Sequence, residues 1–328
     1  MFVKYLRASF VSQYVLIVFI ALLLWLPAFI KASAPVTAHN YSPLYALLQP
    51  VFSSVPLLSV ILAFVIMLTM AFFLNSILAN YQMIGRVSSL GTYAFVTLWS
   101  LSPALTRMHP LLLAMPLVLL AVNVMFRIYE QLDNELDVFN VSFLLSLASW
   151  FFFPLISLII WVYLSMFIMR ITKVRTWLIP LIGFVTPYLF LATFYFLQNR
   201  FIAESKVYLN LPNIISLPDK LPGMTDLIIF GLLFLMVFKA IGVAYSSIVD
   251  NNISIRKRKG IMNAMIFSSL PILFYQSGEL AGRLLLLLPF SVYMAFSLTF
   301  IRKFFWPQLF LFLLTALAMV GNYLVLFQ

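Results

Sequence analysis

The sequence predicts an all-α integral membrane protein, a bundle of about eleven transmembrane helices that forms a single membrane domain over residues 1–328. Two observations lead to this prediction. Hydrophobic residues make up 64% of the chain and charged residues only 9%, which is too little charge to cover a water-soluble protein of this length. The apolar residues also form long uncharged runs, and a run of about 20 residues can cross a bilayer as one helix.

Apolar runs bounded by charged residues, proline or asparagine predict the individual spans. In chain order the expected spans are 13–31, 55–77, 88–104, 109–127, 138–152, 154–170, 177–197, 225–246, 260–277, 283–301 and 307–327. The first run follows two basic residues, as in a signal peptide, but it is longer than a signal-peptide core. In addition, Pro35 directly follows the cleavage-like Ala32-Ser33-Ala34. We therefore expect an uncleaved first span.

The run 138–170 decides how often the chain crosses the membrane. Pro154 within it ends a helix, because proline lacks the backbone donor and clashes with the preceding turn. A reversal at Pro154 gives eleven spans, and an unbroken helix gives ten. With the reversal and a cytoplasmic N-terminus, most lysines and arginines lie on the cytoplasmic side, including RKRK at 256–259. We therefore expect a bacterial inner-membrane protein with its C-terminus on the outer side.

Two outer loops are long, 32–54 and 198–224. In the first, HNYSPLYALLQPVFSS (39–54), Ser42 is suited to cap a helix and Pro43 to occupy its first position. Apolar residues then recur with helical spacing on one face: Leu44, Leu47, Leu48, Val51 and Phe52. This pattern predicts a short interfacial helix kinked at Pro50, the alternative being an ordinary loop. The second loop is long enough to cover a site.

Charge and composition exclude several classes of function. The formal net charge of +11, spread over the loops of a membrane protein, indicates orientation and contact with anionic lipid rather than nucleic-acid binding. The chain has no cysteine, so it forms no disulfide and has no thiolate nucleophile. His39 and His109 are its only histidines, too few for a multi-histidine metal site. We expect no metal and no cofactor.

The order of a span, an outer loop with an interfacial helix, and a many-helix bundle resembles type-C (GT-C) glycosyltransferases. The stretch NVSFLLSLASWFFFPLISLIIWVYLSMFIMR, followed by RTWLIPLIGFVTPYLF, is similar to their short helix, aromatic-proline break and basic inner turn. The resemblance implies a polyprenyl-phosphate carrier on the outer face. Those enzymes usually carry an acid in the first outer loop, and residues 32–54 contain none.

The chain also resembles, over nearly its full length, an uncharacterised family of bacterial polytopic inner-membrane proteins. NYSPLYALLQP, RIYEQLDNELDVFNVSFLLSLASWFFFP and RTWLIPLIGFVTPYLF carry that resemblance. Members are sometimes labelled carotene monooxygenases, an activity that the two histidines do not favour.

The candidate site residues lie on the expected outer side. Glu279 and Arg283 are four residues apart and face the same side of a helix, either as base and phosphate clamp or as an interfacial ion pair. His39 is the residue of the first outer loop that titrates near neutral pH. Arg107, His109 and Arg200 are candidates for binding a lipid phosphate, or are ordinary loop residues.

Charged groups on the inner side favour a structural interpretation. The carboxylates of EQLDNELD (130–137) fit no calcium loop and predict a solvated connector. RKRKG (256–260) predicts a basic loop that contacts anionic lipid.

These observations predict a membrane protein of cell-envelope biogenesis that binds lipid, or serves as a non-catalytic subunit for other envelope membrane proteins. The missing acid in residues 32–54 favours this class. One alternative is a polyprenyl-phosphate-dependent glycosyltransferase or glycan polymerase acting on the outer face. A transporter is a second alternative, although the sequence shows no inverted repeat. Whether the chain is an enzyme stays open, and the sequence names neither a substrate nor a partner protein.

Overall fold

The computed structural model describes residues 5–7, 10–36, 42–84, 88–101, 103–128, 134–209, 242, 253–269, 285–300 and 305–327. Within these residues every regular element is a helix. Four of the described helices are long and apolar enough to cross a membrane: α2 (Val11–Ile30), α4 (Pro56–Asn80), α6 (Pro110–Ile128) and α9 (Val174–Leu197). The described part is therefore an all-helical protein with the composition of a membrane protein.

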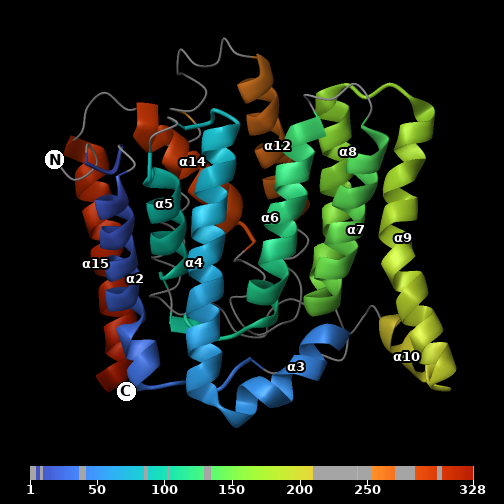
Figure 1. Cartoon of the computed structure of the whole chain (residues 1–328), viewed down its shortest axis with the longest axis horizontal. Coiled ribbons are helices and arrows are strands. Elements are labelled where there is room, and N and C mark those ends of the chain that lie inside the picture. Colours follow the sequence, from blue (N-terminus) through green and yellow to red (C-terminus); the bar gives the residue numbers. More distant parts are fainter. Residues whose placement is uncertain are drawn as a thin grey trace.

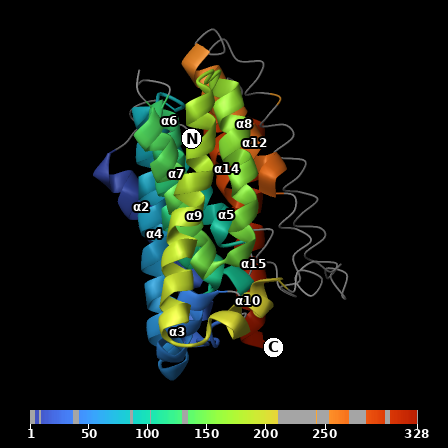
Figure 2. The same cartoon turned by 90° about the vertical axis from the view of Figure 1, so that its right-hand side faces the viewer.

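The other described helices complete an elongated bundle whose long helices run side by side (Figures 1 and 2). They are α3 (Pro43–Ser54), α5 (Leu90–Trp99), α7 (Glu135–Phe151), α8 (Leu158–Met169), α10 (Phe201–Leu209), α12 (Ile253–Ser269), α14 (Leu287–Phe300) and α15 (Phe305–Phe327). Each expected span overlaps one of the described helices, except 225–246, of which only residue 242 is described. The overlap is partial for 260–277, because α12 begins seven residues earlier, at Ile253, and residues 270–277 lie outside the described part. We refer below to the α3 end of the bundle, across which α3 lies, and to the opposite α12 end, where α12 begins (Figure 1).

The run 138–170 is broken, as the sequence predicts. Helix α7 ends at Phe151, a 3-10 turn spans Phe153–Ser157 with Pro154 buried inside it, and α8 follows. Helices α7 and α9 run in the same direction, because Ser146 donates to the Phe184 carbonyl and Ser149 bonds the Tyr188 hydroxyl further along both helices. The intervening α8 must therefore run the opposite way.

Helix α3 forms where the sequence predicts an interfacial helix, with Pro43 as its first residue. Ser42 does not cap it through its side chain, which corrects that detail of the prediction. Tyr45 and Phe52 are buried against the bundle, whereas Leu47, Leu48 and Val51 are exposed. Most of the predicted apolar face thus points away from the bundle, the arrangement expected of a helix that contacts lipid. In the second expected loop, 201–209 form α10, and 210–224 lie outside the described residues.

At the α12 end, two predictions about charge are wrong. Residues 256–259 are not in a loop but in the first two turns of α12, and Arg258 and Lys259 are buried. Asp137 is not solvated either, since it is buried and accepts two hydrogen bonds from Arg127, one of 3.1 Å from Nε. Arg127 lies in the last turn of α6 and Asp137 in the first turn of α7, so the ion pair joins these two helices across the connector.

Candidate functional site

The segment from Trp99 to His109 connects α5 with α6 at the α3 end of the bundle. Helix α5 has ten residues and is about 15 Å long, half of a bilayer crossing, and all ten residues are buried. Beyond it, in the described residues 100–101 and 103–109, the backbone is irregular apart from a short 3-10 turn at Pro103–Leu105. Irregular backbone at membrane depth is tolerated only where protein or a water-filled cavity surrounds it. Segments of this kind often form binding sites in membrane proteins.

Polar side chains from distant helices hold the start of this segment. The Trp25 indole on α2 donates to the Ser100 hydroxyl over 3.0 Å. Asn322 on α15 donates to the Ser100 carbonyl over 2.8 Å and to the Leu24 carbonyl over 3.2 Å. Ser100 is thereby fixed between the first and last described helices of the chain.

The chain before α3 covers the end of the segment. The Val36 N–H donates to the Met108 carbonyl over 3.0 Å. The Tyr45 hydroxyl of α3 donates to the Val36 carbonyl over 2.7 Å and lies 3.5 Å from the Met108 carbonyl. The first expected outer loop therefore packs directly on the TRMHP turn that the sequence singled out.

His109 is buried, and its ring accepts one hydrogen bond and presents one unused donor. It precedes Pro110, the first residue of α6, and its Nδ1 accepts the Leu112 N–H over 3.1 Å, as a helix cap does. The neutral ring therefore carries its proton on Nε2, which is buried and has no hydrogen-bond partner. Burial, and then the charge of Arg107, lower the pKa of His109 to about 3. The side chain is neutral at physiological pH and is unsuited to serve as a general base.

Trp99 places a second N–H donor beside His109. Its ring is stacked on the His109 ring, with centroids 5.8 Å apart, and on the Phe95 ring at 5.4 Å. Its Nε1 is buried and has no hydrogen-bond partner either. A buried N–H without an acceptor costs about 1–3 kcal/mol, so two of them on neighbouring stacked rings indicate a place where acceptor atoms of a ligand belong.

Arg107 adds a positive charge next to these donors, close enough to lower the pKa of His109. Two neutral N–H groups and a guanidinium match an oxyanion such as phosphate, which offers acceptors and negative charge. Among the described residues no cluster of His, Cys, Asp and Glu could hold a metal ion. The described donors of the segment therefore have the chemistry of anion binding.

The structure brings together two of the predicted site residues, Arg107 and His109. Arg200 lies between α9 and α10, where its carbonyl accepts the Glu204 N–H over 3.0 Å. Glu279, Arg283 and His39 lie outside the described residues, so their predicted convergence stays a prediction.

Sequence reasoning missed Trp99 and Asn322. Both lie inside apolar runs that were interpreted as uninterrupted spans, 88–104 and 307–327. The two prolines Pro103 and Pro110 interrupt helices, and their spacing of seven residues was the available signal that the helix in the run 88–104 ends before residue 104.

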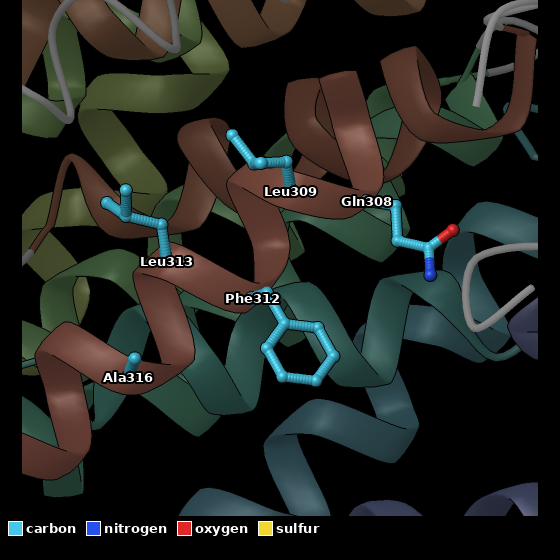
Figure 3. A pocket seen from close by; sticks show the side chains of 5 residues that line it. All are labelled: Gln308, Leu309, Phe312, Leu313 and Ala316. Carbon is cyan, nitrogen blue, oxygen red and sulfur yellow. The ribbon is translucent and has the colours of Figure 1, made fainter. Parts of the chain in front are cut away.

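A groove of about 570 Å³ lies on one face of α15, lined by Gln308, Leu309, Phe312, Leu313 and Ala316 (Figure 3). Its lining is apolar apart from Gln308, so it offers contact for hydrocarbon and no group for chemistry. It lies toward the start of α15, whereas Asn322 reaches the Trp99–His109 segment from the other end of that helix.

Comparison with known proteins finds no relative of this chain, since no protein-family model, no curated protein and no solved structure matches it.

Proposed function

We propose that this protein is an inner-membrane protein of about eleven spans that binds the phosphate group of a lipid at the Trp99–His109 segment without transforming it. One observation carries the proposal. Trp99 Nε1 and His109 Nε2 are buried N–H donors, on stacked rings, without acceptors. The N-terminus is cytoplasmic in this proposal, which puts the α3 end on the outer side, and the lysines and arginines concentrated at the α12 end support that orientation.

A lipid phosphate fits the segment better than a soluble anion. The donors lie at the end of α5, whose ten residues are all buried in the bundle. Helix α3, whose Tyr45 hydroxyl lies 3.5 Å from the Met108 carbonyl of the segment, has an exposed apolar face. A ligand that reaches this depth from the membrane carries hydrocarbon. Polyprenyl phosphates and phospholipids share the phosphate chemistry, and the experiment below separates them.

The proposed function is non-catalytic because the described segment lacks a base. His109 uses Nδ1 to cap α6 and presents a protonated Nε2, so it donates and does not abstract a proton. Residues 32–54 contain no acid. Sugar transfer from a polyprenyl phosphate requires a base or a metal-bound acid at the acceptor.

Two substitutions test the binding site with little change in shape. Trp99→Phe keeps the stacked ring and removes its N–H, and His109→Asn keeps a helix cap and removes the ring donor. Each variant should weaken binding of a polyprenyl phosphate to the purified chain about tenfold, the value of one hydrogen bond to a charged group. Native mass spectrometry across a lipid titration measures this affinity.

The control variant is Trp161→Phe, since the buried Trp161 indole on α8 already donates to the Ile261 carbonyl over 2.9 Å. It should bind the lipid as the parent does. Parallel titrations with phosphatidylglycerol, and with a polyprenol that lacks phosphate, identify the ligand class. Equal binding of the polyprenol, or parent-like affinity in both site variants, would refute the proposal.

The glycosyltransferase alternative rests on Glu279, the candidate base among the acids that the sequence predicts on the outer side. Glu279→Gln, Arg283→Ala and His39→Ala should each restore a deletion strain if the protein only binds lipid. Loss of function by Glu279→Gln with a normal protein level would favour an enzyme instead.

A further inference from the structure

The two donors of the Trp99–His109 segment are buried, so a lipid reaches them only after part of the protein moves. Groups from α2, α15 and α3 bond to this segment. Helices α2 and α15 have 20 and 23 residues and belong to the bundle itself, whereas α3 has twelve residues and lies across its end (Figure 1). Of these three helices, α3 is the one that can move without opening the bundle.

A single residue joins α3 to α4. Val55 is extended, with φ of −135° and ψ of 84°, and Pro56 begins α4. Proline keeps the residue before it out of the helical conformation, so the two helices do not merge into one. Hinges in proteins are a few residues of this kind at the ends of elements. Helix α3 can therefore turn about Val55 while α4 stays in place.

Near its other end, α3 is fastened to the segment by the Tyr45 hydroxyl. This hydroxyl donates to the Val36 carbonyl over 2.7 Å and lies 3.5 Å from the Met108 carbonyl. The Val36 N–H donates to the same Met108 carbonyl over 3.0 Å. We call these three contacts the Tyr45 latch. Because Met108 directly precedes His109, the latch ends on the turn that carries one of the two donors.

The exposed face of α3 keeps the cost of opening low. Leu47, Leu48 and Val51 are exposed on the closed helix, so in a membrane they contact lipid whether α3 is closed or open. The Tyr45 ring is buried in the closed state, and tyrosine is also favoured at the membrane interface. The hydrogen bonds of the latch therefore weigh heavily in the balance between the two positions.

We propose that α3 is a lid, held closed by the Tyr45 latch, which opens about Val55 to admit and release the lipid bound at the Trp99–His109 segment. The inference rests on the function proposed above, because it assigns to α3 the control of that same site. The latch stabilises the closed lid equally with and without a lipid beneath it. Its loss therefore changes the rates of binding and release and leaves the affinity as it is.

Tyr45→Phe removes the latch hydroxyl and keeps the ring. The purified chain is loaded with one polyprenyl phosphate and mixed with an excess of another that has a different chain length, and native mass spectrometry follows the replacement over time. The rates of binding and release should both rise about tenfold, the value of one hydrogen bond, with an unchanged Kd. The matched control is Tyr81→Phe at the α12 end, where the hydroxyl donates to the Asn123 carbonyl over 3.0 Å. It should leave both rates as they are.

Hydrogen exchange of the Val36 amide measures opening in the absence of lipid, because this N–H belongs to the latch. It should exchange about tenfold faster in Tyr45→Phe and at the parent rate in Tyr81→Phe. An unchanged exchange rate at Val36, or unchanged lipid rates in a chain that binds polyprenyl phosphate, would overturn the lid. A parent chain that binds no polyprenyl phosphate would refute the function proposed above, and faster exchange at Val36 in Tyr45→Phe would still show that α3 opens as a lid.

Discussion

Helices α5 and α9 both come from apolar runs, yet they lie in opposite environments. Helix α5 has ten residues and all of them are buried, with α2, α4, α14 and α15 around it. Helix α9 has 24 residues at the edge of the bundle, where it packs mainly on α7 (Figure 1). Its buried stripe is Thr176, Pro180, Gly183, Phe184, Pro187 and Leu191.

The residues that α9 exposes are larger and more apolar than most of those it buries. Leu178, Ile182, Leu189, Phe190 and Phe196 are all more than half exposed. This reverses the pattern of a water-soluble helix and is typical of one whose outer face meets lipid, where small residues allow close helix contact. Hydropathy alone therefore identifies both helices as apolar runs and does not distinguish the exposed helix from the central one.

The largest loss of stability should come from removing the hydrogen bonds that Asn75 of α4 makes with the start of α5. Asn75 on α4 accepts the Gly91 N–H over 3.1 Å and donates to the Ser88 carbonyl over 2.9 Å. Asn75→Leu leaves both buried backbone groups unpaired, at about 1–3 kcal/mol each. We expect a loss of about 4 kcal/mol in the free energy of unfolding, measured by denaturant titration in detergent. A loss below about 1 kcal/mol would mean that α5 is held by apolar packing alone.

The second effect is a dependence of the protein's stability on pH, which arises from His109 near the end of α5. The pKa of His109 is about 3 in the folded protein and about 6.5 in an unfolded chain, so the unfolded state binds more protons between these values. Stability is then complete above pH 6.5 and falls as the pH drops toward 3, by at most about 1.4 kcal/mol per pH unit. Thermal unfolding at pH 7.5 and 4.5 measures it. His109→Asn should flatten this acid-side loss, and an equally steep loss in that variant would assign the titration to another group.

The third prediction concerns the side of α9 that packs on α7, and the measured quantity is the free energy of unfolding. A Cβ on Gly183 would lie 2.8 Å from the Phe139 carbonyl oxygen of α7, so Gly183→Ala must separate the two backbones. We expect a loss of about 2 kcal/mol, measured by the same denaturant titration. Gly321→Ala on α15 is the control, because its nearest contact would be the Leu101 carbonyl at 3.7 Å. If both variants behave alike, the α7–α9 contact is looser than these distances indicate.

The sequence predicts the order of the described helices and the break at Pro154, because both depend on local features, namely apolar runs and a residue that cannot continue a helix. It does not predict how deeply a helix is buried within the bundle. The run 88–104 continues past Trp99 without a charged residue, and the end of the helix at Trp99 coincides with tertiary contacts of Ser100 that the sequence does not predict. Asp137 was assigned to solvent because its partner Arg127 lies across a connector whose closure the sequence does not specify.

The candidate site was predictable in part for the same reason. TRMHP places Arg107 and His109 near each other by sequence alone. The protonation of His109 depends on a helix cap, and the second donor depends on the stacking of Trp99, so neither follows from composition or spacing. The cations of α12 were recognised as a charged stretch, and their burial depends on rings of α4 and α14.

The smallest effect should come from the exposed side of α9. Phe190 is 67% exposed, so in a membrane its ring contacts lipid in the folded protein and also in an unfolded chain that remains inserted. Phe190→Ala should change the free energy of unfolding by less than about 0.5 kcal/mol. Phe184→Ala, six residues away, removes a ring that is 8% exposed and stacks on Tyr188, and should cost about 3 kcal/mol. Unfolding of both variants in the same bilayer mimetic measures the difference. Equal losses would mean that a protein surface rather than lipid covers Phe190 in the membrane, and that α9, like α5, is packed on more than one side.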